Sequence, residues 1–136
     1  MNTPVTAKVE TLTKINDFVV KFANINGSGS ASANNMFAKA VFRMGIPVSP
    51  RNIFPSNIQG LPTWYEVRVS SKGYLGRRGG VDLMVCVNPQ TMEQDMASVE
   101  PGGYFVYDST KPLAPHLHRD DITILGIPLT EMCMRE

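Results

Sequence analysis

The segment of residues 17–45 constrains the fold of this chain more than any other part of the sequence. Its apolar run at 18–23 predicts a strand buried on both faces, because only Lys21 interrupts it. A loop rich in glycine and serine follows, and apolar residues then recur at spacings of three and four, which predicts an amphipathic helix. Gly45 suits the left-handed position that ends a helix, and Pro47 prevents its continuation. This order predicts an α/β protein with the loop at the carboxyl end of its sheet.

The predicted helix has one apolar face, which we expect to pack on the sheet. The spacing assigns these residues to that face: Met36, Phe37, Ala40, Val41 and Met44. Three serines suit the position that caps the start of the helix, and the sequence does not choose among Ser28, Ser30 and Ser32.

Strands and helices alternate over the rest of the chain. Further strands are predicted at residues 64–70, 81–87, 104–107 and 122–127. The first of these alternates between polar and apolar residues, so it is expected near a sheet edge. A short helix is predicted at 88–99, with Asn88 as its cap and Pro89 in its first turn. Four prolines between residues 47 and 62 predict an ordered loop, with one short strand around Ile53 and Phe54.

This alternation predicts a three-layer α/β/α domain with a mainly parallel sheet. One domain is expected over residues 16–136, after a flexible leader at 1–15. The chain stops soon after a new helix begins near Pro128, which would leave the last strand without cover. We therefore expect the domain to be truncated at its C-terminal end.

Charge and composition exclude several classes of protein. The net charge of +1 gives no drive toward nucleic acid or an anionic membrane surface. No apolar run is long enough to cross a bilayer, and the N-terminus lacks the apolar core of a signal peptide, so a cytoplasmic location is expected. Two cysteines are too few to hold an iron–sulfur cluster or a structural zinc. Cys86 lies in an apolar strand, where a buried reduced thiol is expected.

The loop at residues 26–29 is the first candidate site. Gly27 and Gly29 allow the backbone to approach an anion closely, and the following N–H groups point out of the helix start. The alternative is a tight turn without a ligand, and the sequence leaves both open. A dinucleotide fingerprint would need a third glycine where Ser32 stands and a carboxylate about 20 positions further on. NAD is therefore disfavoured, whereas NADP binding through Arg51 stays open.

Two other polar clusters are weaker candidates. Arg77 and Arg78 lie between glycines, and guanidinium groups suit phosphates and carboxylates, but an exposed turn is the favoured interpretation. A second cluster has the donor types of a metal site, although a solvated loop is favoured: His116, His118, Asp120 and Asp121. No nucleophile–base arrangement is supported by spacing, so no catalytic residue and no metal ligand is assigned.

Four segments resemble the γ domain of 2-oxoacid:acceptor oxidoreductases, the family that includes pyruvate and 2-oxoglutarate ferredoxin oxidoreductases. They are residues 26–37 (NGSGSASANNMF), 52–70 (NIFPSNIQGLPTWYEVRVS), 79–85 (GGVDLMV) and 121–131 (DITILGIPLTE). Their order is more specific than any one of them. The chain looks most like the N-terminal part of a fused α-type subunit, in which the γ domain precedes the thiamine-enzyme region.

The resemblance implies a complex that decarboxylates a 2-oxoacid on thiamine diphosphate with magnesium. Coenzyme A then takes up the acyl group, and electrons leave through iron–sulfur clusters to a ferredoxin-type acceptor. In this family the γ domain binds neither the thiamine cofactor nor the clusters. The expected role is to pack against the thiamine-binding α and β regions and to contribute to the coenzyme A region, with no catalysis by the isolated chain.

The same resemblance selects the expected site residues. In the glycine-rich loop of the family, Gly27 and Gly29 match two glycines, while Asn26 and Ser28 stand where glycine and glutamine are usual. In a Ser-x-x-Arg-Gly-Gly run, two residues match and Gln59 replaces the common arginine. The residues expected to face a ligand or a subunit are therefore Asn26, Gly27, Ser28, Gly29, Ser56, Gln59, Gly60, Arg77 and Arg78.

Two other functions stay open at this point. One is a stand-alone reductase that binds NADPH or a flavin. The other is a purely structural assembly module that contacts no small molecule.

Overall fold

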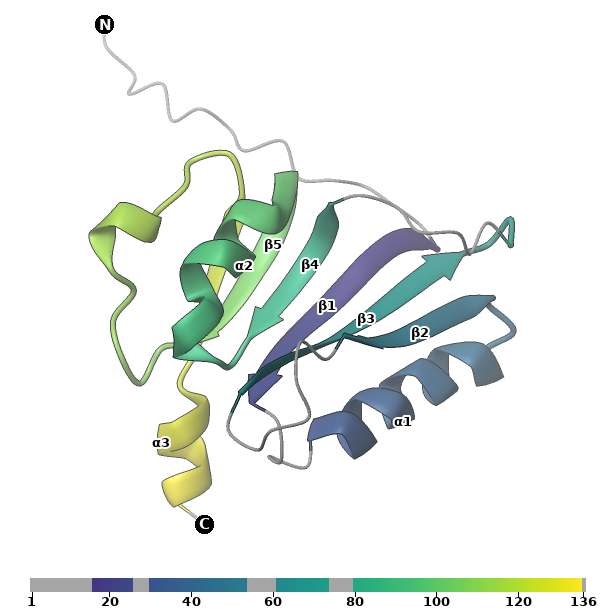
Figure 1. Ribbon diagram of the computed structural model, residues 1–136, viewed down its shortest axis with the longest axis horizontal. Helices are drawn as coiled ribbons and strands as arrows, with labels where there is room; N and C mark the ends of the chain where they lie inside the picture. Colours follow the sequence, from purple (N-terminus) through teal and green to yellow (C-terminus); the bar gives the residue numbers. More distant parts are fainter. Residues whose placement is uncertain (1–15, 26–29, 54–60, 74–79, 136) are drawn as a thin grey trace, which may run out of the picture.

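The computed structural model describes residues 16–25, 30–53, 61–73 and 80–135 (Figure 1). Within them lies a six-stranded sheet of order β2-β3-β1-β4-β5-β6. The strands are β1 (Asp17–Ile25), β2 (Val48–Ile53), β3 (Pro62–Ser70), β4 (Val81–Cys86), β5 (Val99–Asp108) and β6 (Thr123–Ile127). The helices are α1 (Ser30–Arg43), α2 (Met92–Ser98) and α3 (Leu129–Met134), with 3-10 turns η1 (Pro89–Thr91) and η2 (Pro115–Leu117). The predicted leader at 1–15 lies outside the described residues.

The sheet is mainly parallel, as predicted. The strand β1 pairs with β4, β4 with β5, and β5 with β6, all in parallel. Only β3 runs the other way, because it is antiparallel to both β1 and β2. None of the described helices is long and apolar enough to cross a membrane.

The two longer helices lie on opposite faces of the sheet, which gives the predicted three layers (Figure 1). On one face, α1 packs on β1, β2 and β3 through a cluster that contains Ala38, Tyr65 and Val67. On the other face, α2 packs on β4 and β5 through a cluster centred on Met84 and Phe105. Neither helix extends over all six strands of its face.

The prediction for the core face of α1 is confirmed for Val41, which packs on the sheet, but is wrong for Met36, Ala40 and Met44, which are exposed. The residues of α1 that are buried on the sheet are Asn34 and Ala38, with Val41 half-buried, whereas Met36 and Met44 are 70% and 74% exposed. Apolar residues occur on nearly all sides of this helix, so spacing does not identify one face. Small side chains let the helix approach the sheet closely. Among the large residues, Phe37 contacts the ring of Phe22 edge-on at 5.7 Å.

Two other elements differ from prediction. The proline-rich segment forms the six-residue strand β2, which tolerates Pro50 because it is an edge strand and leaves one backbone side unpaired. The strand β5 begins at Val99, before the expected turn, and its register with β4 shifts between Val81 and Leu83. This irregular start needs Gly103, because a Cβ there would lie 2.8 Å from the Asp82 carbonyl oxygen.

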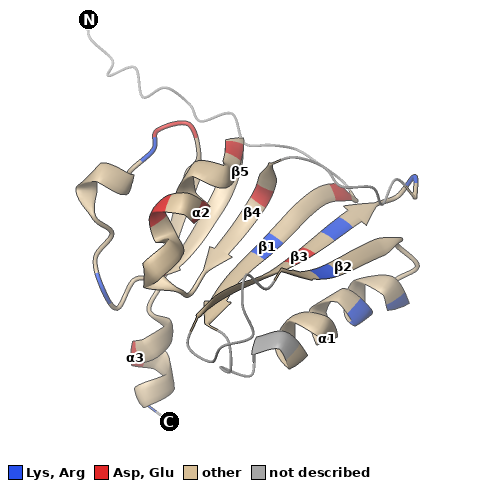
Figure 2. Cartoon of the chain, viewed as in Figure 1, with Lys and Arg blue, Asp and Glu red and all other residues tan. Residues whose placement is uncertain are grey.

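The strands β1, β2 and β3 carry several charged residues (Figure 2). The strand register places Lys21, Arg51, Glu66 and Arg68 on the side that faces away from α1, because Phe22, Tyr65 and Val67 face α1. Arg68 forms an ion pair with Asp17 at 2.7 Å, and Arg51 lies 3.8 Å from Glu66. The Lys21 ammonium lies 5.6 Å from the centre of the Trp64 ring. The charges of this half-face are therefore paired with one another, and the Arg68 and Glu66 side chains are largely shielded from water.

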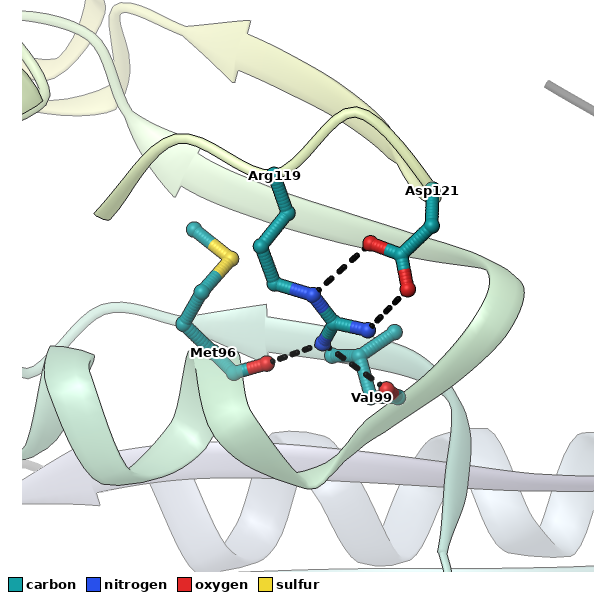
Figure 3. A network of polar contacts seen from close by, with 4 residues as sticks. All are labelled: Met96, Val99, Arg119 and Asp121. Atoms are coloured by element: carbon teal, nitrogen blue, oxygen red, sulfur yellow. Dashed lines mark hydrogen bonds and ion pairs between the residues drawn. The ribbon is translucent and has the colours of Figure 1, made fainter. Parts of the chain in front are cut away.

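Arg119 joins the segment before β6 to the end of α2 (Figure 3). Its Nη1 donates to the carbonyl oxygens of Met96 at 2.7 Å and Val99 at 2.9 Å. Its Nε and Nη2 donate to the two carboxylate oxygens of Asp121, and these hydrogen bonds lower the pKa of that carboxyl. The guanidinium thus adds a charged donor to the Met96 carbonyl, which also accepts the Val99 N–H, and to the carbonyl of Val99 at the helix end.

We predict that Arg119→Ala lowers the free energy of unfolding by about 2 kcal/mol, because two backbone carbonyls lose a charged donor. Urea unfolding followed by far-UV circular dichroism measures this change. Arg135→Ala is the control, since its pair with Glu131 is exposed and should contribute at most about 0.5 kcal/mol. Equal losses in the two variants would contradict the assigned role.

Candidate functional site

The carboxyl ends of β1 and β4 form a topological switch point. These strands are parallel neighbours, but the chain leaves β1 toward α1 on one face and leaves β4 toward α2 on the other. In open α/β sheets such a divergence opens a crevice outside the strand ends, where ligands bind. The segment 26–29 connects β1 to α1, so its described neighbour Ile25 lies at this end of the sheet.

A buried carboxylate, that of Asp95, makes polar contacts beside the carboxyl end of β4. Asp95 of α2 is 1% exposed and accepts hydrogen bonds from Trp64 Nε1 at 2.8 Å and Thr91 Oγ1 at 2.6 Å. Cys86 Sγ lies 3.4 Å from its Oδ2. Burial and the neighbouring Asp95 raise the pKa of Cys86 to about 12, so roughly one such thiol in 10⁵ is ionised at neutral pH. Cys86 is therefore a packing residue and a hydrogen-bond donor, not a nucleophile.

The fully buried side-chain amide of Asn88 connects the segment after β4 to β1. Asn88 Nδ2 donates to the Asn24 carbonyl oxygen at 3.2 Å, and Asn88 Oδ1 accepts from the Gln90 backbone N–H at 3.0 Å. The second bond is the helix cap predicted for Asn88. One side chain thus starts the helical segment after β4 and fixes the end of β1.

A polar pocket of about 410 Å³ lies at the start of α1. It is lined by Ser32, Asn35, Pro50, Asn52 and Tyr65. Asn52 is level with Phe22 through their common partner Tyr65, so the pocket lies toward the carboxyl end of β1. Burial raises the pKa of Tyr65 above its ordinary value of 10.0, so its hydroxyl is a neutral hydrogen-bonding group at neutral pH. The lining offers two amides and two hydroxyls and no charge.

A larger pocket of about 520 Å³ lies between α2 and the connection from β5 to β6. Met92, Leu117 and Pro112 form apolar parts of its wall, and Lys111 and His116 lie at polar parts. At its edge, Asp108 accepts from the Thr130 hydroxyl and backbone N–H and from the Thr110 N–H. Asp108 thereby joins the end of β5 to the start of α3.

These hydrogen bonds, above all the one from the Thr130 hydroxyl, lower the pKa of Asp108 from 3.8 to about 2. A carboxyl whose pKa is lower in the folded state stabilises the fold above its unfolded pKa. This stabilisation is lost as the pH falls through the folded value, here from about 4 to about 2.

We predict that Thr130→Val raises the pKa of Asp108 toward 3.8. The carboxyl carbon-13 chemical shift, followed against pH by NMR, measures the midpoint directly. Thr123→Val is the control, because Thr123 lies opposite Tyr104, at the other end of β6 from the partner of Asp108, so the midpoint should stay near 2. A wild-type midpoint near 3.8 would show that the Thr130 contact does not form in solution.

All nine residues selected by the resemblance lie outside the described residues. Their described neighbours lie at two opposite edges of the sheet. Segments 26–29 and 54–60 follow β1 and β2 in the sequence, and the described ends of these strands, Ile25 and Ile53, lie at the carboxyl edge, where Asn52 lines the 410 Å³ pocket. The segment 74–79 connects the end of β3 to the start of β4, and Ser70 pairs with Asp17 at the start of β1. The length of β1 separates these edges by roughly 26 Å.

The histidine cluster is described, and its side chains are exposed. His118 Nε2 lies 3.0 Å from Asp120 Oδ1, while Asp121 pairs with Arg119. Among the described ranges, no group of three His, Cys, Asp or Glu residues is arranged to hold a metal ion.

Sequence reasoning missed the buried network of Asp95, Trp64 and Thr91. A single carboxylate in a short helix resembles an ordinary exposed residue, and its partner Trp64 is 31 positions away. One local signal exists: Thr91 and Asp95 are four residues apart, at the spacing of neighbours on one helix face.

Comparison with known proteins identifies the family. The chain belongs to the family described as pyruvate ferredoxin/flavodoxin oxidoreductase, which matches residues 19–135. This confirms the resemblance found in the sequence. No curated protein matches the chain by sequence.

Solved structures of the same kind share the fold. A 2-oxoglutarate:ferredoxin oxidoreductase from Magnetococcus marinus, with 2-oxoglutarate, coenzyme A and succinyl-CoA bound, is 27% identical with a TM-score of 0.78. The match covers 90% of this chain and 22% of that one. The pyruvate oxidoreductase subunit PORC from Thermotoga maritima is 16% identical with a TM-score of 0.67, over 90% of this chain and 67% of that subunit. The γ subunit of a keto/oxoacid ferredoxin oxidoreductase from Geobacter sulfurreducens is 17% identical with a TM-score of 0.63, over 82% and 62%.

Proposed function

We propose that this chain is the accessory γ-type domain of a 2-oxoacid:ferredoxin oxidoreductase complex. The complex would convert a 2-oxoacid and coenzyme A into an acyl-CoA, carbon dioxide and reduced ferredoxin. Its thiamine diphosphate, magnesium and iron–sulfur clusters would be bound by partner regions, and this domain would pack against them without catalysing a step. Family membership supports the proposal, as does the coenzyme A bound in the similar Magnetococcus marinus enzyme.

The carboxyl edge of the sheet is the part of the domain that we assign to coenzyme A. The single observation that carries this assignment is the uncharged polar pocket between the start of α1 and the end of β2. Coenzyme A has an adenine, a ribose and two amides, all of which hydrogen-bond to amides and hydroxyls. Phosphate groups suit glycine-rich backbone at the start of a helix of this length.

The nine residues expected from the sequence divide between two proposed roles. The ligand-facing group comprises Asn26, Gly27, Ser28, Gly29, Ser56, Gln59 and Gly60, because their described neighbours border the pocket edge. Arg77 and Arg78 form the subunit-facing group, because the strands on either side of their segment end or begin at the opposite edge. Paired guanidinium groups suit carboxylates on a partner subunit.

We predict that Asn35→Ala combined with Asn52→Ala raises the KM for coenzyme A by about 2- to 10-fold in the assembled complex, since one or two hydrogen bonds are lost. The KM for the 2-oxoacid should not change. Steady-state kinetics of acyl-CoA formation measures both constants. Gln94→Ala is the control, because it removes an exposed amide from α2, which packs on the other face.

The outcomes separate the competing functions. An unchanged KM for coenzyme A would contradict the coenzyme A contact and leave a structural module. Saturable binding of NADPH or FMN to the purified chain would favour a stand-alone reductase. In the same assay, Arg77→Ala with Arg78→Ala should weaken subunit assembly at an unchanged KM, and the reverse pattern would place these arginines at the ligand.

A further inference from the structure

The pocket between α2 and the connection from β5 to β6 has no part in the proposed function. Its volume is about 520 Å³, and small-molecule sites measure roughly 300–1,000 Å³. Cys86 and Asp108 place it beside the last residues of β4 and β5. The carboxyl ends of neighbouring parallel strands are where open α/β sheets bind small ligands. The pocket therefore has the size and the position of a ligand site.

The floor of this pocket is apolar. Val87, which directly follows β4, lines the pocket and is 42% exposed. Met92 of α2 and Leu117 of η2 are half-buried, because they pack on the core cluster and also line the pocket. Pro112 lies on the same lining. An aliphatic group placed here would lose its contact with water, which favours binding.

Hydrogen bonds hold the walls of the pocket in position. The Asn88 side chain accepts from the backbone N–H of Gln90, which lines the pocket. Asp108 accepts from the Thr110 N–H and from the hydroxyl and N–H of Thr130, both of which are also lining residues. A pocket whose walls are already ordered loses little conformational entropy when a ligand binds.

Two charged side chains on opposite walls are left without a partner. Glu93 lies on α2, whereas Lys111 lies on the connection from β5 to β6. Over the described ranges, neither side chain forms an ion pair or a hydrogen bond. Asp108 is not a third such charge, because its oxygens already accept hydrogen bonds. The pocket thus combines an apolar floor with one unpaired anion and one unpaired cation.

We propose that this pocket binds an α-amino acid with an apolar side chain. The carboxylate of the ligand pairs with Lys111, its ammonium pairs with Glu93, and its side chain packs on the apolar floor. A carboxylic acid without an ammonium leaves Glu93 unpaired, and an amine without a carboxylate leaves Lys111 unpaired. The proposal goes beyond the proposed function and does not depend on it, because the 410 Å³ pocket at the start of α1 is the one assigned to coenzyme A.

Titration of the full chain with L-leucine, followed by proton–nitrogen NMR, tests the proposal. The backbone N–H signals of Val87, Met92 and Lys111 should shift saturably, with a dissociation constant of about 1 mM or lower. Three analogues each lack one part of leucine: glycine lacks the apolar group, isocaproate the ammonium and isoamylamine the carboxylate. Each should bind at least about tenfold more weakly than L-leucine.

Two variants test the assigned contacts. Lys111→Met and Glu93→Gln each remove one charge at nearly unchanged size, and each should weaken L-leucine binding by about tenfold or more. Lys72→Met is the matched control, because Lys72 is an exposed lysine after β3 and does not line the pocket. Its affinity for L-leucine should equal that of the wild type.

Four results would overturn the proposal. They are the absence of saturable binding, isocaproate binding as tight as that of L-leucine, unchanged affinity in both charge variants, and displacement of L-leucine by coenzyme A. The last result would assign this pocket to coenzyme A instead. None of these results depends on assembly, so copurification of the chain with a thiamine-binding region tests the proposed function separately.

Discussion

The buried carboxylate of Asp95 is the interaction on which the rest of the structure depends. Burying a carboxylate in an apolar core costs free energy unless each of its oxygens accepts a hydrogen bond. The oxygens of Asp95 accept hydrogen bonds from Trp64, Thr91 and Cys86. These donors belong to β3, the η1 turn and β4, so one side chain of α2 connects the two halves of the sheet. The Asn88 amide extends the connection to the end of β1. The edge that we assign to ligand binding is thereby held in position by buried polar contacts, which are short and directional.

Local patterns predicted the elements that depend on local chemistry. Alternation located β3, Gly45 ended α1 in the left-handed conformation, and Asn88 caps the turn after β4. The core face of α1 could not be predicted, because the side that packs is chosen by how closely the helix must approach β1 and β3. The length of β2 was underestimated for a similar reason, because only a short strand around Ile53 was predicted. Proline disfavours a central strand, but only the sheet order makes β2 an edge strand, where Pro50 is tolerated.

The candidate site also combines features that the sequence predicts with features that only the fold determines. The family resemblance selected three loops from sequence, and two of them have described neighbours beside one polar pocket. The third connects strands at the opposite edge, because β3 alone runs antiparallel. Strand direction is a tertiary property, so no motif in the sequence predicts that Arg77 and Arg78 differ from the other loops in this way.

The most direct test of this account is hydrogen exchange at the indole N–H of Trp64, the only tryptophan in the chain. Its resonance in a proton–nitrogen NMR spectrum is therefore unambiguous. If Asp95 holds this N–H in the core, the signal should persist in deuterated buffer for as long as the slowest backbone amides of β4, because exchange then requires unfolding of the domain. Exchange at the rate of an exposed indole would contradict the central role of Asp95.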